Sequence, residues 1–451
     1  MENPDQEAAN WSRVHLLAFR FAFVYLVLYN LPFPFGVLPR TGLLAREYEL
    51  LWNKLVPWVG RHVLHLNHEI VISNKCSGDT TYDYVRVLCI FGFALAASAL
   101  WPVLGRSHSN YQRLRFHEWL RLYVRLSVGA AMVMYGAGKI FQVQFPQPNL
   151  YKLLQPYGDF TPMGLLWTFM GASRGYSVFT GWVQLFGGIL LFVPRLTTLG
   201  ALVGIAISSN IFLLNLFCNV PVKLYSLHLL LFCCFLVVPD TRRLVNFFLL
   251  NRSVEPAAEI GLFSHNRLSA VALVAQLTFG AFLVCSYIYR ERHYEQQNFG
   301  VAARPPFYGI WMVDEFTLGG KVMPPLLTDG TRWYRVVFQF PKGVGIQSMN
   351  GAWTGYSLRR EMTKSTFIME KPDDPRKKLE FAFSSPDSQS LTLEGSDGEN
   401  EISVRLHRAD EKQFTLLSGG FRWINEDADL VTDEEGVCDH VRRGHGTFLA
   451  R

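Results

Sequence analysis

The stretch "RLSVGAAMVMYGAGKIFQVQFPQP", residues Arg125–Pro148, decides the fold of this chain. Its first half is apolar and dotted with glycines, which is typical of a membrane helix that another helix approaches closely. Lys139 follows where the helix should still be in or near lipid, and a polar, proline-rich segment comes next. The stretch predicts a membrane helix that ends on a lysine, and the role of that lysine bears on function.

The composition agrees with a membrane protein. Of the 451 residues, 49% are hydrophobic and 18% are charged, whereas soluble proteins usually carry about 25% charged residues. The apolar residues form long runs separated by basic loops, and a soluble part is attached. The net charge of +6 needs no nucleic acid to explain it, because the arginines lie mainly beside the apolar runs. We therefore expect no nucleic-acid partner.

The apolar runs predict an α-helical polytopic membrane bundle of about seven transmembrane helices, since each run approaches the ~20 residues that cross a bilayer. The candidate spans are 14–35, 82–104, 119–141, 176–194, 198–219, 223–239 and 269–289. Arginines gather in alternate short loops, and the positive-inside rule makes that side cytoplasmic. The expected location is the bacterial inner membrane, with a cytoplasmic N-terminus and an extracytoplasmic C-terminal domain.

From about residue 300, short alternating runs such as "RWYRVVFQF" and "EISVRLHRA" are punctuated by turn residues. This pattern predicts an all-β sandwich or barrel domain. The opening Gly309-Ile310-Trp311, with a later Arg422-Trp423, resembles the glycine-x-tryptophan start and closing arginine of lipocalin-type barrels. The expected regions are an N-terminal membrane segment with an outer amphipathic loop (1–118), a four-helix membrane core (119–240), a cytoplasmic loop with the last membrane helix (241–298), the β domain (299–426) and a mobile tail (427–451).

Helix 119–141 carries Arg125, Gly129, Met132, Gly136 and Lys139 at steps of four, three, four and three, so these residues share one stripe. The lysine has two interpretations. It either extends to the lipid headgroups, as long side chains at helix ends do, or it forms the polar end of a ligand pocket.

Polar residues from other segments are expected at the same height as this lysine, which favours a polar-ended pocket in an apolar bundle. His228 has the alternative of a satisfied neutral histidine, and Asp79 that of a helix N-cap. The predicted ligand-binding residues are Lys139, His228, Lys223, Asp79, Asp83, Asn215, Tyr135, Gln184 and Asp159. No catalytic residue and no metal, flavin or haem motif is recognised.

"RLSVGAAMVMYGAGKIF" resembles the arginine–glycine–glycine-x-x-lysine helix of the DoxX family, and "FTGWVQLFGGILLFVPRLTTLGALV" looks like the hairpin that follows it in that family. The resemblance covers about residues 120–240. The family often has a glutamate before the double glycine, where this chain has Gln184, which argues against a proton-carrying role there.

Members of that family are described as membrane subunits linked to quinones or to thiol and sulfur oxidation. The resemblance therefore implies a quinone, with Lys139 and His228 as donors to its carbonyl groups, and a redox partner subunit bound through the β domain. The alternative is a non-enzymatic, membrane-anchored binding or assembly protein, whose β domain recruits a partner and whose pocket holds membrane lipid. The sequence leaves open whether the chain is an enzyme.

Overall fold

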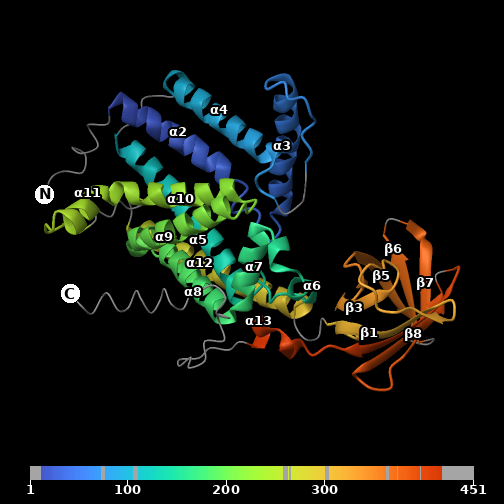
Figure 1. Cartoon of the computed structure of the whole chain (residues 1–451). Helices are drawn as coiled ribbons and strands as arrows, with labels where there is room; N and C mark the ends of the chain where they lie inside the picture. Colours follow the sequence, from blue (N-terminus) through green and yellow to red (C-terminus); the bar gives the residue numbers. More distant parts are fainter. Residues whose placement is uncertain are drawn as a thin grey trace, which may run out of the picture. The chain divides into compact units, whose positions relative to one another are not determined.

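The computed structural model describes residues 12–72, 77–104, 110–256, 263, 266–299, 304–361, 365–372, 374–396 and 398–418. The chain divides into two compact units. The helical unit comprises Met1–Tyr308 with Gln339–Pro341, and the barrel unit comprises Gly309–Phe338 and Lys342–Arg451 (Figure 1). The expected Arg422-Trp423 and the tail from residue 427 lie outside the described residues.

The helical unit is built from long helices joined by short turns. Its elements are α2 (Arg13–Asn30), α3 (Gly42–His62), α4 (Thr81–Leu104), α5 (Asn110–Ile140), α6 (Leu150–Leu153), η2 (Tyr157–Asp159), α7 (Pro162–Ala172), α8 (Arg174–Phe192), η3 (Pro194–Leu196), α9 (Thr197–Phe217), α10 (Lys223–Val237), η4 (Val238–Asp240), α11 (Thr241–Leu244), η5 (Val245–Leu249) and α12 (Asn266–Asn298).

Five stretches of these helices are long and apolar enough to cross a membrane: Thr81–Trp101, Arg174–Phe192, Pro194–Phe217, Lys223–Leu249 and Arg267–Asn298. The predicted count of seven is not confirmed. The two remaining predicted spans, 14–35 and 119–141, overlap α2 and α5, which are helical. Charged residues explain their lower apolarity, since Arg20 lies within α2 and Arg121 and Arg125 lie within α5.

Helix α5 is the central element of the helical unit. It packs against α2, α8, α10 and α12, and one face carries the fully buried Leu120, Val124, Val128 and Met132. These four residues recur at intervals of four along the chain, which places them on one side of the helix. The core of the helical unit is thus organised around α5.

Glycines bring α5 and α8 into backbone contact. A Cβ atom on Gly136 would lie 2.7 Å from the backbone nitrogen of Leu185, and one on Gly181 would lie 2.8 Å from the carbonyl oxygen of Gly136. Small residues are what membrane helices use for such close approach. The glycine pattern that the sequence placed on one stripe therefore forms the seam between these two helices.

The barrel unit is a closed antiparallel barrel, so the structure selects the barrel over the sandwich. Its nine strands follow the order β2-β1-β3-β4-β5-β6-β7-β8-β9, and pairing of β1 with β9 closes a ring of all strands except the short β2. The elements are β1 (Gly309–Leu318), β2 (Lys321–Val322), β3 (Trp333–Phe340), β4 (Gly343–Ser348), β5 (Trp353–Glu361), β6 (Thr366–Lys371), β7 (Asp374–Ser384), β8 (Ser390–Ser396), β9 (Glu401–Arg408), η8 (Glu411–Gln413) and α13 (Thr415–Ser418).

Aromatic side chains fill the barrel. Phe316 and Trp333 have ring centroids 5.6 Å apart, Trp333 and Phe381 lie 5.7 Å apart, and Phe338 and Phe367 lie 5.8 Å apart. All five of these residues are buried. Alternating inward residues from successive strands thus pack into a solid core, as side chains do in small barrels.

Gly309, at the start of β1, has two reasons to be glycine. Its φ of +146° is a conformation that other residues rarely adopt. A Cβ atom there would also lie 2.8 Å from Nε of Arg408, the last residue of β9. The neighbouring Trp311 is buried and pairs with Arg408 across the closing strands. Arg408 therefore lies beside the glycine-x-tryptophan segment.

Replacing Gly181 with alanine should destabilise the helical unit, because the new methyl group would meet the backbone of α5. The matched control is Gly175→Ala on the same helix, where a Cβ atom has no neighbour within 4 Å. Alanine favours a helix over glycine by about 1 kcal/mol, so the control should unfold at the same or a higher temperature. The unfolding temperature of both variants is measured in a mild detergent. Equal effects of the two changes would contradict the close contact of α5 and α8 at Gly181.

Candidate functional site

Lys139 does not extend to solvent or to the surface of the helical unit. Its side chain is 6% exposed, and Nζ donates a hydrogen bond of 2.6 Å to Oε1 of Gln184 on α8. Gln184 is also buried. Of the two interpretations of this lysine, extension to the headgroups is therefore excluded. The pair links the two helices of the glycine seam.

His228 uses both ring nitrogens. Nδ1 lies 2.6 Å from the carbonyl oxygen of Leu224, and Nε2 lies 2.6 Å from the hydroxyl oxygen of Tyr25. Because a carbonyl oxygen only accepts, Nδ1 carries the hydrogen, and in the neutral ring Nε2 accepts from the tyrosine. The ring of Tyr29 stacks on the histidine at 3.9 Å with an interplanar angle of 9°. Both ring nitrogens of His228 are therefore satisfied within the protein.

Asp79 caps α10 from a distant part of the chain. Its two carboxylate oxygens accept hydrogen bonds from the backbone N–H groups of Lys223 at 2.8 Å and Leu224 at 2.9 Å. The lysine ammonium lies 3.5 Å from the same carboxylate. A negative charge at a helix N-terminus is stabilising. Asp79 is therefore a helix cap, as the alternative interpretation held, although of α10 and not of its own helix.

The remaining predicted residues each have contacts of their own. Asp83 accepts hydrogen bonds from the backbone and hydroxyl of Thr80, which closes the start of α4. Asn215 donates to Ser226 at 3.1 Å. Tyr135 faces the ring of Tyr225 at 6.2 Å, and Asp159 is exposed in η2. In the described parts of the chain, no hydrogen bond or ion pair joins the Lys139–Gln184 pair to His228 or to Asp79.

Two open grooves mark the helical unit, and none of the predicted ligand-binding residues lines either of them. The larger, about 1050 Å³, lies between α2, α3 and α4 and includes Leu28, Trp52, Phe93 and Trp101. The smaller, about 780 Å³, runs along α12. Both are lined almost wholly by apolar side chains. Such surfaces suit contact with hydrocarbon chains.

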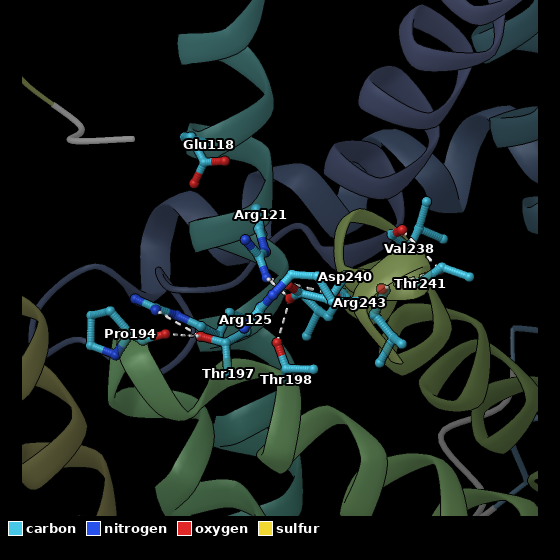
Figure 2. Close-up of polar contacts among 12 residues, drawn as sticks. Glu118, Arg121, Arg125, Pro194, Thr197, Thr198, Val238, Asp240, Thr241 and Arg243 are labelled. Carbon is cyan, nitrogen blue, oxygen red and sulfur yellow. Dashed lines mark hydrogen bonds and ion pairs between the residues drawn. The ribbon is translucent and has the colours of Figure 1, made fainter. Parts of the chain in front are cut away.

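A charged cluster that the sequence analysis did not predict joins α5, α9 and α11 (Figure 2). Asp240 is its centre. One carboxylate oxygen accepts from Arg121 at 3.2 Å and from the hydroxyl of Thr198, and the other accepts from Arg243 at 2.6 Å. A partial signal is present in the sequence, since Asp240 is an acidic residue directly at the end of an apolar run. Its arginine partner lies 119 residues away, which sequence spacing does not reveal.

Arg125 lies one turn further along α5. Its guanidinium group donates to the hydroxyl of Thr197 at 3.1 Å and to the side-chain oxygen of Gln276 on α12. Arg125 is 6% exposed. These contacts tie three helices together at the end of the bundle where α9 begins. Because each contact joins separate helices, the cluster stabilises the bundle.

Replacing Asp240 with asparagine should lower the stability of the helical unit by about 2 kcal/mol, because Arg121 and Arg243 would lose a charged acceptor. The control is Asp159→Asn, since that residue is exposed. Chemical unfolding in a mild detergent measures the difference. Equal stability of the two variants would contradict the role given to Asp240.

Comparison with known proteins gives one informative relative. No family model matches the chain. No solved structure matches it either. "Uncharacterized protein YwoB" of Bacillus subtilis (strain 168) is 30% identical to the chain over 124 residues, which cover 28% of this chain and 79% of YwoB. A match of this identity over most of the relative establishes common descent for that part. The chain belongs to the same family as YwoB.

Proposed function

We propose that the chain is a non-enzymatic, membrane-anchored binding or assembly protein. In this proposal the helical unit is the anchor, the N-terminus is cytoplasmic, and the barrel unit recruits a partner on the extracytoplasmic side. The observation that carries it is that two of the predicted ligand-binding residues, His228 and Asp79, have their hydrogen-bonding groups used within the protein. His228 is occupied by Tyr25 and Leu224, and Asp79 by the start of α10, so neither offers a free group to a ligand.

The apolar exterior of the helical unit supports an anchor. Large hydrophobic side chains such as Phe186, Val271 and Leu249 are more than half exposed in the isolated chain. Soluble proteins rarely present such extended apolar surface. Within a bilayer the same side chains would contact lipid, which would make membrane lipid the first partner of the chain.

The barrel surface supports recruitment. Because aromatic rings fill the interior, a partner would bind outside. Leu326 and Leu327 are 57% and 79% exposed on the loop between β2 and β3. This loop lies at the barrel end opposite Gly309, where the chain comes from α12, since β1 ends beside β2.

The loop is held in a fixed shape. Buried Arg332 donates to the carbonyl oxygen of Met323 at 3.0 Å, and the backbone of Asn350 donates to that of Asp329 at 3.0 Å. A rigid loop that presents two leucines costs little entropy when a partner binds. Exposed Trp353 starts β5, directly after the turn that contains Asn350. Exposed leucines and a tryptophan are side chains that suit an apolar pocket on a protein partner.

The second candidate is a subunit of a quinone-linked redox system, as the DoxX resemblance implies. Lys139 favours it. The ammonium group has three hydrogens, and Gln184 is its one hydrogen-bond partner among the described residues, where no carboxylate lies within 4 Å of it. A quinone carbonyl would be a suitable acceptor for a second hydrogen.

Extraction of bound small molecules from the full chain in a mild detergent, followed by mass spectrometry, separates the two candidates. We expect phospholipid alone, in equal amounts in the wild type and in Lys139→Met. A stoichiometric quinone in the wild type that is missing from folded Lys139→Met would instead establish the quinone-linked candidate.

A photoreactive amino acid placed at Leu327 tests recruitment in native membranes. We expect a cross-linked product of defined mass at this position and none at Ser388, an exposed position in the turn between β7 and β8 at the other end of the barrel. The cross-linked peptides identify the partner by mass spectrometry. No product at Leu327, or the same products at both positions, would contradict recruitment through this loop.

A further inference from the structure

The cluster of Figure 2 holds more positive than negative charge. Arg121 and Arg243 share one carboxylate, that of Asp240, and Arg125, one turn further along α5, makes no ion pair among the described residues. Glu118 is the next acid along α5; its carboxylate lies 3.4 Å from Nδ1 of His117 and makes no ion pair with these arginines, although its charge acts on Arg125. Among the described residues of the cluster, three guanidinium groups therefore face two carboxylates, which leaves one positive charge in excess.

Burial of Arg125 makes the excess of positive charge energetically unfavourable. It is 94% removed from solvent, and both of its hydrogen-bond partners, Thr197 and Gln276, are neutral. The Nε atoms of Arg125 and Arg121 are buried without an acceptor among the described residues. A buried cation without a counterion is unfavourable, so an anion at this cluster would offset the cost.

The cluster is accessible through its other two arginines. The side chain of Arg121 is 22% exposed and that of Arg243 is 39% exposed, whereas that of Asp240 is 9% exposed. Helix α9 begins here, and its N-cap residue, Leu196, supplies no side-chain acceptor to the first turn. The helix dipole adds to the attraction for an anion.

The position of the cluster along the helices limits the class of anion. It lies at the start of the apolar stretch Pro194–Phe217 and in the last part of Lys223–Leu249. In a bilayer, the end of a spanning helix lies at the level of the phosphate groups. We propose that Arg121 and Arg243, with the charge of buried Arg125 behind them, form a binding site for a phosphate group, with the headgroup of an anionic phospholipid as its source.

The test measures thermal unfolding of the full chain in a mild detergent during titration with phosphatidylglycerol, phosphatidylcholine or inorganic phosphate. Phosphatidylglycerol should raise the unfolding temperature at lower concentration than phosphatidylcholine, because only the former carries a net negative charge. Arg243→Gln should increase the phosphatidylglycerol concentration at half-effect about tenfold, as expected when one charged contact is lost, and Arg243→Lys should recover part of that loss. Arg243 is partly exposed, so these variants should fold.

Arg290→Gln is the control for general attraction between a basic protein and an anionic lipid. Arg290 is an exposed arginine on α12 that pairs with Glu291 at 2.7 Å, away from the cluster. Its replacement should leave the titration unchanged. If inorganic phosphate alone acts like the anionic lipid and Arg243→Gln weakens it, the site stands with soluble phosphate as the source. Equal effects of the two lipids, or equal effects of Arg243→Gln and Arg290→Gln, would overturn the proposal.

Discussion

A polar side chain buried among apolar helices must find its hydrogen-bond partner within the protein, because hydrocarbon offers none. This constraint organises the helical unit. Lys139 bonds Gln184 across the glycine seam, His228 bonds Tyr25, and Arg125 bonds Thr197 and Gln276. Each bond joins two different helices. Burial of any of these polar side chains without a partner would be unfavourable. The hydrogen bonds that satisfy them therefore also determine how the helices pack.

The same constraint separates two kinds of buried polar group with different consequences. His228 and Asp79 have their hydrogen-bonding capacity used, so they act as structural groups. Lys139 and Arg125 have neutral partners only and keep unbalanced charge. A ligand would gain the most favourable binding energy beside these two residues. Lys139 is the basis of the quinone-linked candidate, and Arg125 contributes to the proposed phosphate site. In the barrel unit aromatic side chains fill the interior, so a partner would bind to the outer surface.

The sequence predicted the general architecture because its signals are periodic. Apolar runs predicted membrane helices. The glycines at steps of three and four predicted close approach of another helix or of a flat ligand, and alternation after residue 300 predicted a sandwich or a barrel. The count of seven spans was not confirmed, since charged residues within α2 and α5 reduce their apolarity. The predicted pocket joined residues by their height in the membrane. Height does not determine direction. The structure joins Lys139 with Gln184 and Asp79 with Lys223, and no hydrogen bond or ion pair among the described residues links the first pair to the second. Asp240 and Arg121 are too far apart in the chain for their spacing to indicate contact.

A double-mutant cycle on Lys139 and Gln184 tests most directly whether buried polar pairs hold the bundle together. The free energy of unfolding is measured in a mild detergent for the wild type, Lys139→Met, Gln184→Leu and the double variant. The account predicts a favourable coupling of about 0.6–2 kcal/mol between the two side chains, the range found for hydrogen bonds between membrane helices. Additive effects with no coupling would contradict the account. Lys139 would then be better explained as a ligand-binding group than as a structural one.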